Sequence, residues 1–401
     1  MTIENIGKAV RREPTVFVET KEEFVVDVMQ PYNELTPISE LYIRPTEEIT
    51  QLVEQTRVAL ALLDYAVGKL PSSNILLDSI ALQEAKSSSK IENIVTTNDE
   101  LYSGLALQEV RGAVKEVVDY KEALFIGFQE LRRKGLIALS DIENINRVVN
   151  KKEPGVRHNM AEFAETLTRI ANIKEDGSNE VLYTPPHGKD LLLKLLVDIL
   201  EFIYDDERYN LHPLIKIALA HYQFESIHPF YDGNGRTGRI LNILFLCQKE
   251  YLRQPVLYAS AYIIKNKDEY YRLLRETHQH EDYNKVIAYM LTSFYHTAQE
   301  TLQKVEAIES LYKHYVSQEF LSKLPGNKTV LEQVVTLAFE KVYLRITDLV
   351  EAGVHRQTAS AHLHNLVESG LLTVETVKRE KLFKNMELLK LFGGKNNENQ
   401  H

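Results

Sequence analysis

The stretch HPFYDGNGRTGR, residues 228–239, decides how the rest of the chain is interpreted. The hydrophobic periodicity on either side predicts that one helix ends near Ser226 and that the next begins near Arg236. Glycines around an asparagine let backbone N–H groups converge on one point, and the positive end of the following helix dipole also attracts an anion. The stretch therefore predicts a site for phosphate groups.

Charged side chains in the same stretch supply the groups that a reaction on phosphate needs. Arg236 and Arg239 are three residues apart on the first helical turn, so we expect both guanidinium groups to point at the same anion. Asp232 offers hard oxygen ligands that suit Mg²⁺ beside phosphates. His228 is the side chain best suited to accept a proton at neutral pH. Together these groups predict nucleotidyl or phosphoryl transfer.

The stretch resembles the signature of the Fic family, His-x-Phe-x-Asp/Glu-Gly-Asn-Gly-Arg-x-x-Arg, at every defining position. The resemblance covers about residues 75–300. It implies an α-helical enzyme that transfers AMP from ATP to a Ser, Thr or Tyr hydroxyl of a target protein, with Mg²⁺ as cofactor. Relatives transfer other nucleotides, phosphocholine or phosphate, but the complete Gly-Asn-Gly-Arg-x-x-Arg pattern favours ATP. Family members often dimerise, so a homodimer is expected.

The resemblance also implies a role for each residue of the site. His228 is expected to deprotonate the target hydroxyl, and Asp232 to bind Mg²⁺. Phe230 is expected to anchor the loop in the core. Tyr270 is expected to pack on adenine, with Tyr271 in the core. The residues expected to hold the nucleotide phosphates are Gly233, Asn234, Gly235, Arg236, Thr237, Gly238 and Arg239.

Residues 155–186 depart from the helical pattern and predict a β-hairpin, because Gly177, Ser178 and Asn179 precede a run of β-forming residues. In Fic proteins a hairpin flap in this place docks the target segment by strand addition. The resemblance places the flap at about 173–187. An ordinary surface hairpin is the alternative. The expected docking residues are Val181, Leu182, Tyr183 and Thr184.

The upstream segment Ser88-Ser-Lys-Ile-Glu-Asn93 resembles the inhibitory motif Ser/Thr-x-x-x-Glu-Gly/Asn of autoinhibited Fic proteins. On a helix expected at about 75–95, Ser88 and Glu92 share one face. Glu92 is then expected to pair with Arg239, and Asn93 is the last residue of the motif. ATP is expected to bind with its α-phosphate misaligned for attack by the hydroxyl. The alternative is a solvated helix glutamate. In some relatives this glutamate positions water to remove AMP, so the reverse reaction stays open.

The segment after residue 325 predicts a winged helix-turn-helix, because two short helices joined at Gly353 precede a two-stranded hairpin. This raises a competing function, a DNA-binding regulator with a vestigial or regulatory Fic domain; contact with a protein is the other interpretation. Nine Lys or Arg face eight Asp or Glu over residues 326–390, a small excess for a nucleic-acid domain. The candidate DNA contacts are Arg356, Lys378, Arg379 and Lys381.

The composition describes a globular protein of 401 residues with 44% hydrophobic residues and a net charge of −10. This balance argues against non-specific coating of nucleic acid. A single cysteine, Cys247, excludes an internal disulfide framework and a cysteine-based zinc site. The sequence contains no signal-peptide segment and no membrane-length apolar run, so we expect a cytoplasmic protein without a membrane partner.

The expected fold class is mainly α, a Fic-type helical bundle with a β-hairpin flap, followed by an α+β winged helix-turn-helix domain. The expected division is an N-terminal arm and helical cap at 1–105, the catalytic domain at 106–300, a linker helix at 301–325, the winged helix at 326–392 and a disordered tail at 393–401.

Overall fold

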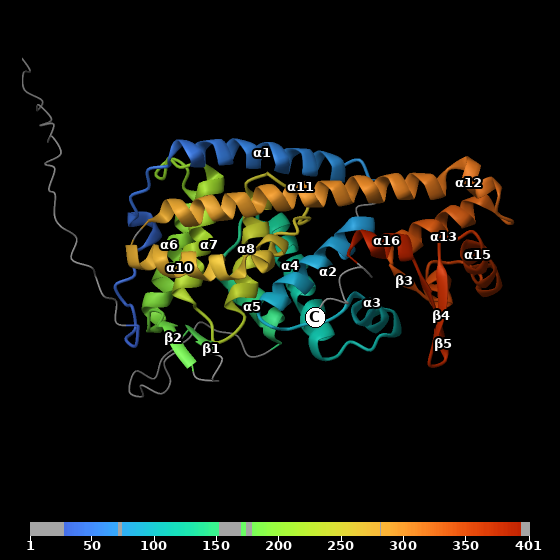
Figure 1. The fold of residues 1–401 in the computed structure, drawn as a ribbon, viewed down its shortest axis with the longest axis horizontal. Coiled ribbons are helices and arrows are strands. Elements are labelled where there is room, and N and C mark those ends of the chain that lie inside the picture. The colour runs from blue at the N-terminus through green and yellow to red at the C-terminus, as the bar shows by residue number, and fades with distance from the viewer. Residues whose placement is uncertain (1–27, 71–73, 152–169, 174–178, 281, 394–401) are drawn as a thin grey trace, which may run out of the picture.

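The computed structural model describes residues 28–70, 74–151, 170–173, 179–280 and 282–393, and it is mainly α-helical (Figure 1). This confirms the predicted fold class. The first part contains a short 3-10 helix η1 (Ile38–Glu40), a hairpin of β1 (Ile170–Ile173) and β2 (Asn179–Tyr183), and the helices α1 (Glu47–Val67), α2 (Asn74–Ile91), α3 (Asn98–Leu107), α4 (Gly112–Lys134), α5 (Leu139–Asn150), α6 (Lys189–Tyr204), α7 (Pro213–Ile227), α8 (Asn234–Gln248), α9 (Ser260–Lys265), α10 (Lys267–His280) and α11 (Tyr283–Val316).

Local sequence signals explain where several of these helices begin. The Thr46 hydroxyl accepts the backbone N–H of Ile49 and caps α1. Thr97 and Glu100 form a reciprocal capping box at the start of α3. Asn98 is therefore the first residue of α3, as the sequence predicts.

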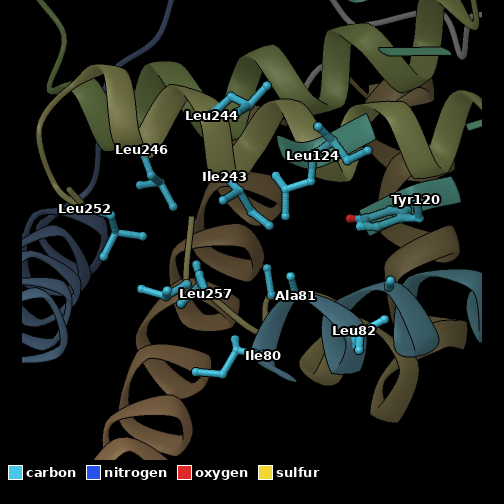
Figure 2. Packing of buried hydrophobic residues seen from close by; sticks show 14 of the residues in the cluster. Ile80, Ala81, Leu82, Tyr120, Leu124, Ile243, Leu244, Leu246, Leu252 and Leu257 are labelled. Atoms are coloured by element: carbon cyan, nitrogen blue, oxygen red, sulfur yellow. The ribbon is translucent and has the colours of Figure 1, made fainter. Parts of the chain in front are cut away.

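The core lies around α7 and α8, which are buried on almost all sides because they are apolar around most of their circumference. Figure 2 shows how side chains of α2, α4 and α8 meet there, with Ala81 and Leu124 beside Ile243. The long pair α1 and α11 runs along one side of the molecule (Figure 1). This packing brings the end of α2 beside the start of α8, where residues 228–239 lie.

The C-terminal part is a small α+β domain in the order of a winged helix-turn-helix. Its antiparallel sheet has the strand order β3-β5-β4, and Lys384 of β5 lies between Tyr343 and Thr373. Its elements are α12 (Gln318–Ser322), α13 (Lys328–Glu340), β3 (Tyr343–Leu344), α14 (Ile346–Glu351), α15 (Arg356–Glu368), β4 (Thr373–Val377), β5 (Glu380–Lys384) and α16 (Met386–Leu391).

Some features differ from the sequence-based expectations. The elements α9, α12, β3 and α16 were not predicted, because two to six residues carry too little periodicity to reveal them. Helix α11 runs unbroken through residue 300, where a domain boundary was expected. Residues 1–27 of the expected N-terminal arm, residues 394–401 of the expected tail and the hairpin residues 174–178 lie outside the described residues. No described helix is both long enough and apolar enough to cross a membrane.

Candidate active site

The loop that begins the stretch 228–239 is fixed by the side chain of Asn234. Its amide oxygen accepts the backbone N–H of Phe230, and its amide nitrogen donates to the Phe230 carbonyl, both at 2.8 Å. Phe230 is buried in the core, as predicted. The expectation that the Asn234 amide holds phosphate is therefore corrected: this amide bonds within the loop. The donors that remain there are backbone N–H groups in the first turn of α8.

The expected base and the expected metal ligand lie at the two ends of this loop. His228 caps the end of α7 in a left-handed conformation, with φ 48°. The carboxylate of Asp232 accepts the backbone N–H of Gly233 at 2.7 Å and is half exposed. The Asp232 carbonyl accepts hydrogen bonds from Asn146 and Asn150 at 2.9 and 2.8 Å. Helix α5 therefore positions the residue that carries the expected metal ligand.

Arg236 is buried and bonded to residues outside the stretch. Its Nη1 donates to Glu116 at 2.6 Å, its Nη2 donates to Asn150 at 3.1 Å, and its Nη2 lies 3.6 Å from the Asp232 carboxylate. Sequence reasoning missed Glu116, Asn146 and Asn150. The available signal was the i,i+4 spacing of the two asparagines, which puts both on one face of α5.

Arg239 is also buried, but it turns to the end of α2. Its Nε donates to the Ser88 hydroxyl at 2.8 Å, and its Nη2 donates to the Ser88 carbonyl at 3.0 Å and to Glu92 Oε1 at 2.8 Å. The expected contact between Glu92 and Arg239 is thus present. The two arginines bind different carboxylates: Arg236 pairs with Glu116, and Arg239 pairs with Glu92. That both bind one anion stays a prediction.

The end of α2 explains how Glu92 reaches this position. The helix ends at Ile91, so Glu92 is the residue after the helix, and the expectation that it lies within the helix is wrong by one residue. The N–H of Asn93 donates to the Lys90 carbonyl and the N–H of Ile94 donates to the Ser89 carbonyl, both at 3.0 Å. These are the two bonds of a Schellman motif, which requires a left-handed residue. Asn93 supplies it with φ 61°.

Gly235 permits the close approach of Glu92 to α8. A Cβ atom on Gly235 would collide with Glu92 Oε1 and would stand 2.8 Å from Arg239 Nη1. The carboxylate therefore lies against the second residue of α8, at the positive end of the helix dipole. A helix N-terminus of this kind is a favourable site for an anion.

The next two residues of the stretch have packing roles. Thr237 is fully buried, and its hydroxyl accepts a hydrogen bond from Asn146 at 3.1 Å. Its backbone N–H donates to the Gly233 carbonyl, so Thr237 has no N–H left for a ligand. A Cβ on Gly238 would collide with Glu225 of α7, so glycine allows α7 and α8 to pack closely. These packing roles account for both residues, and their expected contact with phosphate stays a prediction.

Two carboxyl groups near Arg239 have pKa values shifted in opposite directions. Burial by itself raises the pKa of Glu92, but the charge and hydrogen bond of Arg239 outweigh it, so the pKa is lowered. Burial raises the pKa of Glu225 to about 7, against the opposing charge of Arg239. Glu92 is therefore ionised at neutral pH, whereas Glu225 titrates there.

The hairpin expected as the flap is present as β1 paired with β2. The Tyr183 hydroxyl donates to the Ser226 carbonyl at 3.1 Å, which fixes β2 next to the end of α7. Thr184 is buried, and its hydroxyl donates to the carbonyl of Val28 at 2.6 Å. The Thr184 side chain is therefore bonded within the chain. Val181 is partly exposed, and the side chain of Leu182 lies outside the described residues.

Both tyrosines of α10 lie in or against the hydrophobic core. Tyr270 is 2% exposed, and its hydroxyl lies 2.8 Å from the ring nitrogen Nε2 of buried His221. It is a core residue, so the prediction that it packs on adenine is wrong for this structure. Tyr271 is partly exposed, and burial together with the charge of Glu92 raises its pKa. Neighbouring positions on a helix point about 100° apart, so the sequence pattern alone does not decide which of two adjacent tyrosines is buried more deeply.

The four candidate DNA contacts occupy two places in the C-terminal domain. Arg356 is exposed at the start of α15, Arg379 is exposed at the turn between β4 and β5, and Lys381 is exposed in β5. Lys378 is exposed too, but its Nζ donates to both carboxylate oxygens of Glu109, each at 2.6 Å. One of the four cations is thus paired with the segment that follows α3.

Comparison with known proteins identifies the chain. A model described as "Fic/DOC family N-terminal" matches residues 50–129, and a model described as "Fic/DOC family" matches residues 137–246, which include the whole stretch 228–239. The chain belongs to the Fic family. A third model, "Protein adenylyltransferase SoFic-like, C-terminal domain", matches residues 315–388. The three matched segments together run from residue 50 to residue 388.

Curated relatives in the Fic family match one part of the chain. Protein adenylyltransferase fic-1 of Caenorhabditis elegans is 32% identical over 89 residues, 22% of this chain and 16% of that protein. Protein adenylyltransferase Fic of Drosophila grimshawi is 36% identical over 93 residues, 23% of this chain and 18% of that protein. The chain spans less than a fifth of the length of these relatives.

A solved structure of a Fic family protein from Desulfovibrio desulfuricans G20 matches the fold. It covers 86% of this chain and 98% of its own chain, with a TM-score of 0.51 and 18% identity. The likeness supports the Fic fold over most of the molecule.

Proposed function

We propose that this Fic protein is an adenylyltransferase that moves AMP from ATP to a hydroxyl side chain of a target protein, and that Glu92 inhibits it. The observation that carries the proposal is the position of the Glu92 carboxylate, bonded to buried Arg239 and seated against Gly235. An anion is already favoured at this point, and a phosphate group of ATP suits the same donors.

The proposed reaction begins with removal of a proton from the target hydroxyl by His228. The hydroxyl oxygen then forms a bond to the α-phosphorus of ATP, and the bond from that phosphorus to the bridging oxygen breaks. Pyrophosphate leaves with the electron pair. Arg236, Arg239 and the backbone N–H groups of the first turn of α8 stabilise the charge on the phosphates. Residues 179–183 of β2 lie where an extended target segment would dock by strand addition.

The residues present fit Mg²⁺ shared with a nucleotide. Within the described ranges no group of three or more His, Cys, Asp or Glu side chains could enclose a metal ion. Mg²⁺ commonly binds one or two carboxylates together with phosphate oxygens and water. Asp232 offers one such carboxylate, half exposed and held at the start of α8. Bound Mg²⁺ would neutralise charge that develops on the phosphates.

Inhibition follows from competition for Arg239. While Glu92 accepts from Nη2, a phosphate group cannot take the same place, because a carboxylate and a phosphate would approach the same donors with like charge. ATP bound without this contact is displaced from the in-line geometry, and a displacement of about 1 Å costs about 100-fold in rate.

The test is incubation of wild type, Glu92→Gly and His228→Ala with Mg²⁺ and ATP labelled on the α- or the γ-phosphate. We expect α-label on protein, more for Glu92→Gly than for wild type and none for His228→Ala. Because His228 lies outside the arginine contacts, the His228→Ala variant should still bind ATP. If protein is labelled only by ATP that carries its label on the γ-phosphate, the enzyme transfers phosphate instead of AMP. If a target that already carries α-label loses it during incubation, the protein also catalyses the reverse reaction, removal of AMP.

Nucleic-acid binding is the second candidate function, favoured by the exposure of Arg356, Arg379 and Lys381 on one domain. Electrophoretic mobility of short DNA duplexes at rising salt concentration tests it. Binding that weakens with salt and with Arg356→Ala would support this function. Binding to the same extent by the variant would exclude α15 as the contact.

A further inference from the structure

The residue that contacts Arg239 lies on a short connection between two helices. Residues 92–97 join the end of α2 at Ile91 to the start of α3 at Asn98. Six residues span at most about 20 Å. Glu92 therefore cannot move far from Arg239 unless α2, α3 or both move as well.

On the α2 side, the connection is fixed by polar side chains in the interior. Glu84 accepts hydrogen bonds from the Tyr120 hydroxyl at 3.0 Å and from the backbone N–H of Ser260 at 2.8 Å. The apolar face of the same helix packs on α4 and α8, with Ala81 near Leu124 (Figure 2). Moving α2 would break a buried hydrogen-bonded network and a hydrophobic contact, which makes α2 the immobile anchor.

On the α3 side, the first residue of the helix joins three parts of the chain. The side-chain oxygen of Asn98 accepts hydrogen bonds from Lys86 at 2.8 Å and from Gln83 at 3.2 Å, both on α2. Its side-chain nitrogen donates to the Phe392 carbonyl at 3.3 Å, directly after α16. The Asn98 amide is buried, so these bonds have little competition from water.

The next residue, Asp99, is held by the sheet of the C-terminal domain. Its carboxylate accepts from Lys384 and from the Tyr343 hydroxyl, both at 2.8 Å. The Lys384 ammonium also lies 4.5 Å from the centre of the Tyr343 ring, and Tyr343 packs against Tyr102 of α3 with ring centroids 5.7 Å apart. Figure 1 shows α3 beside this domain. The C-terminal domain thus holds α3, which anchors the second end of residues 92–97.

We propose that the C-terminal domain is part of the inhibitory apparatus: its contacts with Asn98 and Asp99 hold α3 in place and thereby keep Glu92 on Arg239. The proposal rests on the proposed function, because it assigns a role to the contact that inhibits AMP transfer. Loss of the Asp99 and Asn98 contacts frees one end of residues 92–97. Glu92 then leaves Arg239 for a larger fraction of the time, and ATP binds in the productive position.

The test uses the full chain with Lys384→Met, which removes the cation at Asp99 and keeps most of the side-chain volume. Asp99→Asn is the second variant, because it removes the charge and can still accept from Tyr343. Lys341→Met is the matched control: Lys341 is in the same domain and pairs at 2.6 Å with Asp348, which belongs to that domain and not to α3. Circular dichroism and thermal unfolding show whether each variant is folded.

Two readouts are measured on each variant, transfer of α-label to protein and hydrogen exchange of the amides of residues 88–97. We expect Lys384→Met and Asp99→Asn to raise transfer roughly 5-fold or more, the usual lower range of coupling between sites. Exchange at Ile94 should accelerate, because its N–H bonds to Ser89 only while the end of α2 is intact. Lys341→Met should change neither readout. Combined with Glu92→Gly, neither test variant should raise transfer further, because the contact is already absent.

The outcomes separate this proposal from the proposed function. If Glu92→Gly itself transfers no α-label, the proposed function fails, and hydrogen exchange still reports whether the C-terminal domain holds residues 88–97. Unchanged exchange at Ile94 in folded Lys384→Met and Asp99→Asn overturns the proposal. An equal rise of transfer in the Glu92→Gly background would also overturn it, because the effect would not pass through Glu92.

Discussion

The Glu92 carboxylate lies directly over Gly235, in the space that a side chain at position 235 would fill. The two residues are far apart in sequence, and they meet because the last turn of α2 ends at the first turn of α8. Glu92 and the proposed anion site therefore share one volume, so a change at Glu92 is expected to alter both stability and ligand binding.

Glu92→Gly should lower the stability of the protein as well as release its activity. Removing one partner of a buried ion pair costs about 3–5 kcal/mol, and the cost here should be nearer 2–3 kcal/mol because Glu92 is 34% exposed and Ser88 still binds Arg239. ATP should restore much of the loss by supplying a new anion to Arg239. Thermal unfolding with and without ATP measures this. A smaller shift with ATP for the variant than for wild type would contradict it.

Gly235→Ala should destabilise the inhibited protein by about 1–3 kcal/mol, because the added methyl group collides with Glu92 and Arg239. In the Glu92→Gly background the penalty should shrink, since one of the two colliding groups is gone. Denaturant unfolding of the two single variants and the double variant measures the coupling. Additive losses would show that the methyl group is accommodated without displacing Glu92.

Asn93→Val should loosen the end of α2, because a β-branched residue is strained at φ 61°. The expected loss of stability is about 1–2 kcal/mol. Asn93→Gly is the control, since glycine adopts this conformation without strain and should leave stability nearly unchanged. Hydrogen exchange at the amides of residues 93 and 94 locates the effect. Equal losses in both variants would point to the Asn93 side chain instead of its backbone conformation.

The Glu92 contact should be insensitive to pH across the neutral range. The pKa of Glu92 is lowered in the folded protein. The contact therefore stabilises the protein at pH values above the ordinary pKa of a glutamate, and this stabilisation is lost as the pH falls through the lowered pKa of Glu92. The ratio of AMP transfer by Glu92→Gly to that by wild type should stay constant between pH 6 and pH 8. A ratio that falls steadily toward pH 6 would mean that Glu92 is protonated there.

The stability that Glu225 contributes should change with pH in the opposite direction. Its pKa is raised to about 7, so between the ordinary glutamate pKa and about pH 7 the folded protein binds more protons than the unfolded chain. Stability from this group is therefore lost as pH rises through that range. Denaturant unfolding of Glu225→Gln at pH 5 and pH 8 tests this: the variant should lose less stability between the two pH values than wild type does. Identical losses would contradict the raised pKa.

The sequence predicted the helices well where a helix is long, and the Glu92–Arg239 contact followed from resemblance. Glu116 and Asn150 were not predicted, because their contacts depend on how α4 and α5 pack against α8, which no local pattern encodes. The error at Tyr270 has a different origin. Periodicity assigns a helix more securely than the rotation of that helix about its axis, and it did not indicate that Tyr270 is buried in the core.

The unbroken course of α11 limits how the two halves of the molecule can move. Its 34 residues extend about 50 Å without a proline or glycine, and it contacts α1 and α7 before it reaches α13 and α16. Such a rod has no hinge along its own length, so the C-terminal domain could swing as a separate body only if the chain bent after Val316. The contacts of α11 with α13 and α16 oppose that bend, so a signal received by the C-terminal domain would travel by small shifts of the helices packed beside it, α3 among them.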